Sequence, residues 1–372
     1  MSIALLFLSC VLLAQAQTHS AAEEMNIRGM AAFAEGHYAA AKALYQAAVD
    51  DLQPPKNRPD ALVLAGVINN QAVLAQAEGR YAEARTLFTQ SLAIKKDILP
   101  ADSASMASSL NNLATLCKEI RSFEEAKALL KRAIAMQQRV LGHDDPETAS
   151  MIHNLAGVYF DMGQYSKAQP LFEEARDIRR RLADGKDDNN AATLSFLAKL
   201  ALLQGRASDA QALYVQSLRI RRERHGELHP EIANAMSDLG SFYSDVGRYD
   251  EAEQMFRKAL AMYETIFGPV HPKSAGTLGR CAAMYRKAGR YHDAVQVYES
   301  LLPLTERLYG PQDSTVADLL ENYAEVLKKI KMKNEAKAAG QRARLIRANT
   351  VDVTAHTIDL SALQGSRKQS YR

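Results

Sequence analysis

Small apolar residues recur along most of this chain at a constant spacing of forty-two positions. Alanine holds one of these positions in every copy, and alanine or glycine holds a second one, twelve residues earlier. Self-similarity at a fixed period of this length is the signature of a repeat array. The first series is Ala84, Ala126, Ala168, Ala210, Ala252, Ala294 and Ala336, and the second is Ala72, Ala114, Ala156, Ala198, Gly240, Ala282 and Ala324.

Each copy predicts two helices joined by a tight turn. The first helix ends at a residue that is usually glycine, which suits the left-handed conformation that closes a helix. Arg121 and Lys331 stand at this position in two copies, so we expect them to adopt that conformation at some cost, or to change the turn. The predicted first helices end at Gly79, Arg121, Gly163, Gly205, Gly247, Gly289 and Lys331.

Serine residues near the start of two second helices have the spacing of a capping box. Ser166 precedes Gln169 by three positions, and Ser208 precedes Gln211 by three. In this motif the serine side chain accepts a backbone hydrogen bond while the glutamine side chain reaches back to the cap. We therefore expect these second helices to begin at the two serines.

The recurring small residues are explained by close packing of helices. Antiparallel helices approach to about 8–10 Å only where the side chains at their crossing are small. Larger residues recur around the small ones, and we expect them to form a stacking core rather than a ligand site because every copy repeats them. On the second helices these are Phe88, Leu130, Phe172, Tyr214, Phe256 and Tyr298.

The repeat pattern predicts one continuous array flanked by two different ends. We assign residues 17–53 to a first helix pair, 54–59 to a proline-rich connector, 60–349 to seven units of forty-two residues, and 350–372 to a disordered tail. An array grows by adding neighbours, so its length need not divide it into separate domains. The loop Asp184–Asn190 lacks the proline of its sister loops and is predicted to be a soft joint.

The first sixteen residues read as a secretory signal. A mostly aliphatic run from Ile3 to Leu13 is followed by Ala14-Gln15-Ala16, which has small residues where a signal peptidase cleaves. The run is shorter than the roughly 20 apolar residues that span a bilayer, so no stable membrane span is expected. Cleavage near Ala16 and Gln17 would make the protein secreted or periplasmic, and would leave Cys117 and Cys281 as buried free thiols.

Composition and motifs argue against several functional classes. The formal net charge is only +3, which favours neither nucleic acid nor an acidic membrane as a partner. No phosphate loop, nucleophile elbow or dinucleotide motif is present, and no nucleophile, base and orienting group can be assembled, so we expect neither catalysis nor a cofactor. His225 and His229 have helical spacing, but a turn and the lack of a third ligand argue against a metal site.

The order of small residue, glycine, tyrosine, alanine and aromatic residue resembles the tetratricopeptide repeat. The longer period, with Asn111-Asn112-Leu113-Ala114 and Gly226-Glu227-Leu228-His229-Pro230, resembles the kinesin light chain variety. This resemblance covers about Ala22 to Asn349 and implies an all-α fold, a right-handed α-α superhelix of about eight helix pairs. A signal peptide is foreign to a cytosolic motor subunit, so an exported bacterial repeat protein is the better match and the cargo role is not carried over.

The resemblance also implies a binding site for a protein or peptide. The first helices would line a concave groove, and the residue two before the small position would point inward. Asparagine both donates and accepts hydrogen bonds, so a ladder of such residues could hold an extended peptide backbone, although it could instead bond the neighbouring helix. The inward set is Asn70, Asn112, Asn154, Phe196, Asp238, Arg280 and Asn322, with Ser108, Thr115 and Lys118 beside it.

Two other functions remain open at this point. The array could assemble with itself as a structural component of the cell envelope, and the sequence leaves the oligomeric state undetermined. Alternatively, arginines one repeat apart could stack into a basic outer ridge that binds an anionic polymer, although Asp177 and Glu223 among them favour a solvated face. The ridge would comprise Arg179, Arg180, Arg181, Arg219, Arg221, Arg222 and Arg224.

Overall fold

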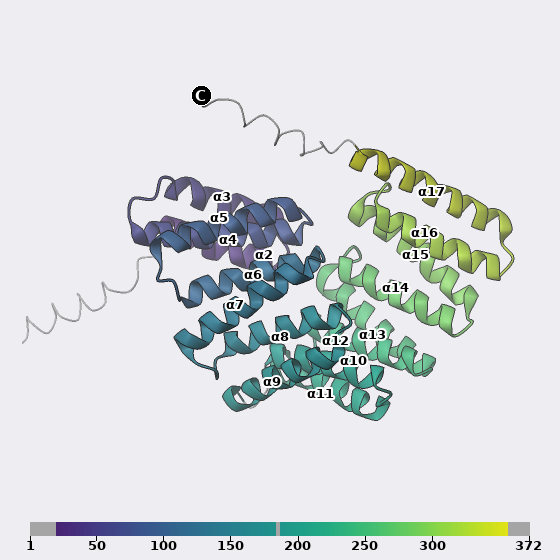
Figure 1. The fold of residues 1–372 in the computed structure, drawn as a ribbon. Helices are drawn as coiled ribbons and strands as arrows, with labels where there is room; N and C mark the ends of the chain where they lie inside the picture. The colour runs from purple at the N-terminus through teal and green to yellow at the C-terminus, as the bar shows by residue number, and fades with distance from the viewer. Residues whose placement is uncertain (1–19, 184–186, 356–372) are drawn as a thin grey trace, which may run out of the picture. The chain divides into compact units, whose positions relative to one another are not determined.

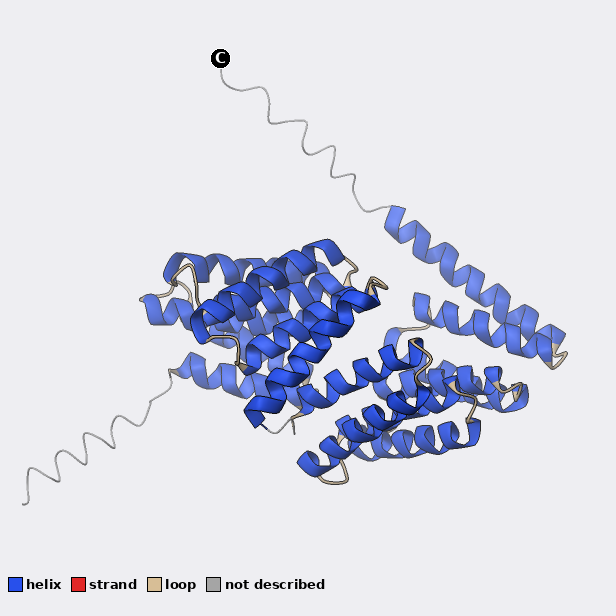
Figure 2. Cartoon of the chain, turned by 60° about the horizontal axis from the view of Figure 1, so that its bottom comes forward, coloured by secondary structure: helices blue, strands red, loops and turns tan. Residues whose placement is uncertain are grey.

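The computed structural model describes residues 20–183 and 187–355 of the 372-residue chain. These residues form sixteen α-helices and no strands. Figure 2 shows the helices in blue, joined by loops in tan. They belong to two compact units that divide between Gly185 and Lys186, inside the loop predicted to be a joint. The predicted all-α fold of eight helix pairs is confirmed, with four pairs in each unit.

In unit 1 each first helix packs antiparallel to the second helix of its pair, and each second helix packs on the next first helix. Figure 1 shows these pairs in chain order from purple to teal. The helices are α2 (Ala21–Ala34), α3 (Tyr38–Leu52), α4 (Arg58–Ala77), α5 (Tyr81–Ile98), α6 (Ala104–Glu119), α7 (Phe123–Leu141), α8 (Pro146–Asp161) and α9 (Tyr165–Ala183).

Unit 2 repeats the same arrangement, with first helices α10, α12, α14 and α16. Its helices run from teal through green to yellow in Figure 1. They are α10 (Asp188–Leu203), α11 (Ala207–His225), α12 (Pro230–Asp245), α13 (Tyr249–Phe267), α14 (Pro272–Lys287), α15 (Tyr291–Tyr309), α16 (Ser314–Lys329) and α17 (Lys333–Ala355).

The recurring small residues pack inside the pairs as predicted. Each of the alanines in the two series is buried. Gly240 of α12 faces the Phe256 ring of α13, where a Cβ atom would lie 2.9 Å from Cε1 of that ring. Gly29 is in the same register in the first pair, and a Cβ there would lie 2.5 Å from Cε1 of Tyr45. The small residue therefore makes room for the large side chain sixteen positions later.

The turns within the pairs use the left-handed conformation, including the two that lack glycine. Arg121 has φ of 60° and Lys331 has φ of 66°, which confirms the prediction from the sequence. The amide of Ser122 donates to the carbonyl of Cys117 over 2.7 Å, just as the amide of Arg80 donates to the carbonyl of Ala75 over 2.8 Å. The backbone hydrogen bonds are retained, so the non-glycine residue carries the steric cost alone.

The predicted capping boxes are wrong. The second helices α9 and α11 begin at Tyr165 and Ala207, so Ser166 and Ser208 already lie in the first turn. In α11 the preceding Arg206 makes no side-chain capping bond. The caps lie instead on first helices, where a side chain accepts from a backbone amide near the helix start. These residues include Ser20, Asn57, Ser103, Asp145, Asp187 and Asp313.

Two predicted boundaries also move. Helix α4 begins at Arg58, inside the expected connector 54–59, because proline is tolerated in the first turn of a helix and Pro59 lies there. Helix α17 continues to Ala355, beyond the expected start of the tail at residue 350, and neither glycine nor proline interrupts residues 341–355. The predicted signal, residues 1–16, and residues 356–372 lie outside the described part of the chain.

Cys117 and Cys281 are buried free thiols, as predicted. Burial is the main cause that raises the pKa of each to about 11, so neither thiol is a nucleophile near neutral pH. Among the helices of residues 20–183 and 187–355, none is both long enough and apolar enough to cross a membrane.

Candidate functional site

The first helices of each unit form a surface that we call the first-helix face of that unit. Three cavities open on these faces, one in unit 1 and two in unit 2. Each is lined mainly by consecutive first helices, and the second helices add Arg221, Tyr263 and Tyr291 in unit 2. Unit 1 contributes α2, α4 and α6, whereas unit 2 contributes α10, α12, α14 and α16. Neighbouring repeats therefore contribute chemically different side chains to the same cavity.

The unit 1 cavity has a volume of about 280 Å³ and combines an apolar wall with polar groups. Two predicted site residues, Asn112 and Thr115, line it. The hydroxyl of Thr115 also donates to the carbonyl of Asn111 in its own helix, over 3.0 Å. Ser108 and Lys118 lie on the same helix but do not line the cavity, and Lys118 Nζ is 3.5 Å from Asp161 Oδ2. The complete lining is Phe33, Val73, Gln76, Ala77, Asn112, Thr115 and Glu119.

The predicted asparagine ladder links neighbouring first helices. Asn70 Nδ2 donates to Oδ1 of Asn26 over 2.9 Å, and Asn154 Nδ2 donates to Oδ1 of Asn111 over 2.8 Å. Asn112 makes the corresponding bond to Oδ1 of Asn69, at 3.3 Å. These bonds are the alternative that the sequence left open. Because each uses only one amide hydrogen and each side chain is half-buried, the bonds do not by themselves exclude contact with a ligand.

The second cavity, in unit 2, has a volume of about 370 Å³ and is the most highly charged. Two predicted residues meet here, since Arg280 Nη1 lies 3.0 Å from Asp238 Oδ1. The same nitrogen donates to Ser237 Oγ over 3.1 Å. Phe196, another predicted site residue, makes a cation–π contact with Lys199, whose Nζ lies 5.0 Å from the ring centroid. Lys199 lines the cavity.

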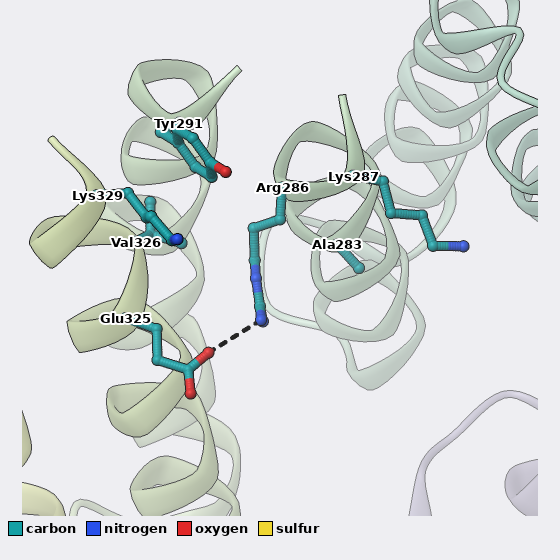
Figure 3. Close-up of a pocket in the computed structure, with 7 residues that line it drawn as sticks. All are labelled: Ala283, Arg286, Lys287, Tyr291, Glu325, Val326 and Lys329. Carbon is teal, nitrogen blue, oxygen red and sulfur yellow. Dashed lines mark hydrogen bonds and ion pairs between the residues drawn. The ribbon is translucent and has the colours of Figure 1, made fainter. Parts of the chain in front are cut away.

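The third cavity, also in unit 2, lies between α14 and α16 and has a volume of about 420 Å³. In Figure 3 the Arg286 side chain points toward Glu325, to which it is paired over 3.1 Å, whereas Lys287 points away. Arg286 also donates to Oδ1 of the predicted residue Asn322 over 2.6 Å. Asn322 thus orients an arginine that lines the cavity, without lining it. The lining is Ala283, Arg286, Lys287, Tyr291, Glu325, Val326 and Lys329.

A periodic set of buried polar side chains was missed by reasoning from the sequence. Each lies at the same register of a second helix, forty-two residues from the next, and several reach a first helix. Lys95 Nζ donates to Ser109 Oγ over 2.7 Å, and the Tyr263 hydroxyl donates to Oδ1 of Asn234 over 2.5 Å. The sequence pattern that could have revealed this set is a polar residue that recurs every forty-two positions among apolar neighbours on the second helices. The set is Lys95, Gln137, Arg179, Arg221, Tyr263 and Thr305.

The arginines considered for a basic outer ridge, against which Asp177 and Glu223 already argued, include two buried side chains. Arg179 in unit 1 and Arg221 in unit 2 belong to the buried set and are only 4% and 5% exposed. The exposed members include ion-paired side chains, such as Arg181 with Asp144 at 2.5 Å and Arg219 with Glu223 at 2.9 Å. Sequence spacing could not separate the buried register from the exposed one, because both hold arginine.

His225 and His229 serve the connection between α11 and α12. Their rings stack with centroids 3.7 Å apart, and His225 Nε2 lies 2.8 Å from Asp188. His229 Nδ1 accepts from the amide of Glu231 over 3.2 Å, and burial is the largest cause that lowers the pKa of His229. Within the described ranges, no group of three or more histidine, cysteine, aspartate or glutamate side chains could hold a metal ion.

Comparison with solved structures finds the same fold at low sequence identity. The apo form of the quorum sensor NprR from B. thuringiensis has a TM-score of 0.62 and 12% identity, covering 88% of this chain and 87% of that one. The Rap conjugation gene regulator of the plasmid pLS20, in complex with the Phr* peptide, has a TM-score of 0.56 and 13% identity, covering 81% and 79%.

Kinesin-light-chain-like repeats are also among the similar structures. The nearly identical repeats of a putative kinesin light chain from Podosopora anserina share 24% identity with a TM-score of 0.44, covering 54% of this chain and 95% of that one. A search of curated proteins finds no match.

The tetratricopeptide repeat model matches six overlapping stretches of the sequence, which together run from residue 63 to residue 347. They are residues 63–139, 105–181, 147–223, 189–265, 231–304 and 273–347. These matches cover well over half of the chain and coincide with the helix pairs that share the small-residue register. The chain therefore belongs to the tetratricopeptide repeat family, and its repeats are forty-two residues long.

Proposed function

We propose that this protein is a non-enzymatic scaffold that binds an extended peptide segment of a protein partner on its first-helix faces. The observation that carries the proposal is the set of three cavities on these faces, each with apolar and hydrogen-bonding side chains from consecutive first helices. A small number of polar groups within an apolar surface is typical of binding sites.

Two further observations support the proposal. The tetratricopeptide repeat fold is generally an interaction scaffold, and the similar Rap regulator was solved with a peptide. In addition, the buried thiols have pKa values raised to about 11, and none of the three cavity linings contains histidine, cysteine or serine apart from Ser237. Ser237 contacts Arg280 and Thr277 rather than a base, which suits binding and not nucleophilic catalysis.

Localisation is part of the same proposal. The sequence pattern of residues 1–16 supports export, so the peptide partner would be met outside the cytoplasm. Expression in a bacterium followed by fractionation and mass measurement tests this. We expect a chain that begins at Gln17 in the exported fraction, and a full-length cytoplasmic chain would contradict it.

Peptide selection tests the binding proposal. Binders selected from a random dodecamer library against the full chain are measured again on Ala77→Arg, which fills the unit 1 cavity, and on Ala283→Arg, which fills the α14–α16 cavity. Both alanines are exposed, and arginine is a good helix former, so folding should be unaffected. We expect at least one of these variants to bind each selected peptide tenfold or more weakly.

The matched control is Ala82→Arg, an exposed position on the second helix α5. It adds the same side chain and charge away from the first-helix face and should bind normally. Peptides that bind all three variants equally, or a library from which no binder emerges, would show that the first-helix faces are not the site.

A further inference from the structure

A cavity of unit 2 that the proposed function does not use lies between the second helices α13 and α15. It has a volume of about 590 Å³, within the range of roughly 300–1,000 Å³ that is typical of small-ligand sites. The first part of α14 and the loop before it complete the wall. No residue that lines this cavity also lines one of the three cavities on the first-helix faces, so it is a separate site.

Two lining serines, Ser274 and Ser300, account for the opening. At both positions the other six units of forty-two residues carry larger side chains, which would occupy space that is empty here. The cavity is therefore specific to one place in the array and is not a general feature of the repeat. The residues that correspond to Ser300 are Gln90, Arg132, Glu174, Gln216, Lys258 and Arg342, and those that correspond to Ser274 are Leu64, Met106, Thr148, Asn190, Ile232 and Val316.

Three polar side chains of the lining have no partner among the described residues. Ser274 is only 7% exposed, and its hydroxyl makes no hydrogen bond within the described ranges. Glu264 of α13 and Arg307 of α15 carry opposite charges, yet neither side chain forms an ion pair or a hydrogen bond with a described residue. A buried hydroxyl without a partner costs free energy, so a ligand that supplied one would be bound favourably.

The rest of the lining is mainly apolar. Leu260, Leu278 and Leu304 come from three different helices, and Pro269 and Val270 come from the loop between α13 and α14. Val270 is 38% exposed, so a ligand group that covered it would remove apolar surface from water. An apolar wall with one anion and one cation at hand matches a ligand that carries both charges beside an apolar body.

We propose that this cavity binds a small zwitterion with an apolar side chain, namely a free amino acid or dipeptide of the leucine type. The ligand carboxylate would pair with Arg307 and the ligand ammonium with Glu264, while the apolar side chain covers the leucines. Ser274 would gain its missing hydrogen bond from the same polar groups. An internal peptide segment has neither terminal charge, so this proposal goes beyond peptide binding on the first-helix faces and does not depend on it.

A series of related ligands tests the zwitterion. Isothermal titration calorimetry on the full chain compares leucine and leucyl-leucine with glycine, N-acetyl-leucine and leucinamide. We expect leucine or leucyl-leucine to bind, and the better of the two gives the length of the ligand. Glycine lacks the apolar group, N-acetyl-leucine lacks the ammonium and leucinamide lacks the carboxylate, so each should bind at least about tenfold more weakly than leucine.

A variant that closes the cavity locates the site. Ser300→Arg introduces the residue type that two other units carry at this position, Arg132 and Arg342, so the helix should form normally. It should weaken binding of the better ligand at least about tenfold by filling the cavity. The matched control is Gln296→Arg on the same helix, an exposed position outside the lining, and it should leave the affinity within twofold of wild type.

Two further variants assign the charges. Arg307→Gln should abolish the preference for leucine over leucinamide, and Glu264→Gln should abolish the preference for leucine over N-acetyl-leucine. Both side chains are exposed and make no ion pair with a described residue, so neither change should affect folding. These variants keep the test decisive if Ser300→Arg does not fold.

Each contrary outcome is distinct. Failure of every ligand to bind the wild-type chain would overturn the proposal, and so would binding that Ser300→Arg leaves within twofold of wild type. Equal affinities for leucine and both blocked forms would overturn the zwitterion. Ala283→Arg, which fills a cavity on the first-helix face, should leave leucine binding unchanged, so success or failure here is separate from that of peptide binding.

Discussion

Gly240 of α12 and Phe256 of α13 are packed so closely that a Cβ atom on Gly240 would lie 2.9 Å from Cε1 of the ring. Phe256 is fully buried, with 0% of its surface exposed, so the ring has little freedom to move away. Other helix pairs have alanine at the position of Gly240, as in Ala72 with Phe88. Because those pairs must leave room for a methyl group, the separation of the two helices differs from pair to pair. The small-residue series therefore marks a packing constraint that differs in detail from unit to unit.

Replacement of Gly240 by alanine should destabilise unit 2. Forcing one methyl group into this contact is an overpacking change, for which a cost of about 1–3 kcal/mol is typical. The measurement is the urea midpoint followed by circular dichroism. The matched control is Gly276→Ala on α14, where the added Cβ would meet no atom within 4 Å apart from its chain neighbours and its own helix backbone. That change should stabilise by about 0.5–1 kcal/mol, and shifts of the same sign in both variants would contradict the packing account.

Replacement of Arg121 by glycine should stabilise unit 1. Arg121 holds φ of 60°, a conformation that costs a residue with a Cβ atom roughly 1–2 kcal/mol. The gain should be smaller, about 0.5 kcal/mol, because glycine also makes the unfolded chain more flexible and because the contact of the guanidinium with the Phe123 ring is lost. The reverse change, Gly163→Arg at φ of 71°, should destabilise by about 1 kcal/mol. Thermal unfolding checks both predictions: the midpoint should rise for Arg121→Gly and fall for Gly163→Arg.

His153 should make unit 1 less stable as the pH falls. Burial, followed by the charges of Arg179 and Lys118, lowers the pKa of His153 from 6.5 to about 3. Between these values the unfolded chain binds a proton and the folded chain does not, so stability decreases as pH falls below 6.5. From pH 7 to pH 5 this group should contribute a loss of about 2 kcal/mol.

The test compares urea unfolding of the wild type and His153→Gln at pH 7 and pH 5. Carboxylate titration is common to both proteins, so the difference between them isolates the histidine. Parallel pH dependences for the two proteins would show that the folded state accommodates protonated His153.

A double-mutant cycle should separate packing from binding in the asparagine ladder. The Asn154 amide donates to Oδ1 of Asn111 over 2.8 Å, so Asn154→Ala should cost about 1 kcal/mol by leaving that oxygen without its donor. Combining Asn154→Ala with Asn111→Ala should reveal a coupling free energy of about 0.5–1.5 kcal/mol. Zero coupling would mean that the bond contributes nothing to folding and that both amides are available to a ligand.

The two thiols should be unreactive in the folded protein. Cys117 and Cys281 are 0% and 6% exposed, and burial raises the pKa of each to about 11. Reaction with Ellman's reagent at pH 8 should therefore be slow until guanidinium unfolds the chain. A mature chain beginning at Gln17 should then release two equivalents, whereas a chain that retains Cys10 should release three. Rapid reaction of the native protein would contradict the burial of these side chains.

Much of the fold could be predicted because a repeated sequence shows which positions are structurally equivalent. The alanine series, the turn residues and the aromatic series each recur at one interval, so the helix pairs, the small crossing positions and the left-handed Arg121 and Lys331 followed directly. Helix starts were less predictable. Ser166 and Ser208 had the spacing of a cap but lie within the helices, because local spacing does not reveal which residue leaves the helical conformation first.

The candidate site was only partly predictable, for a related reason. Periodicity identified the first-helix residues and brought Asp238 to Arg280, but side-chain partners depend on lateral contacts between units. From the sequence, Asn112 and Asn154 could either bind a ligand or hydrogen-bond to the neighbouring helix, because an asparagine side chain can do both. Arg179 and Arg221 were grouped with the exposed arginines because the sequence of an arginine-rich segment does not show which side chain faces the core.

The sequence by itself determined the class of structure, since a fixed forty-two-residue period with two small positions can bury its apolar residues only by stacking helix pairs. Tertiary structure alone decided which polar side chains are consumed by packing and which are left with an unused donor, as at Ser274. The physical reason is that apolar burial depends on pattern, which is local and periodic, whereas the pairing of a polar group depends on distances of a few tenths of an ångström between helices far apart in the chain.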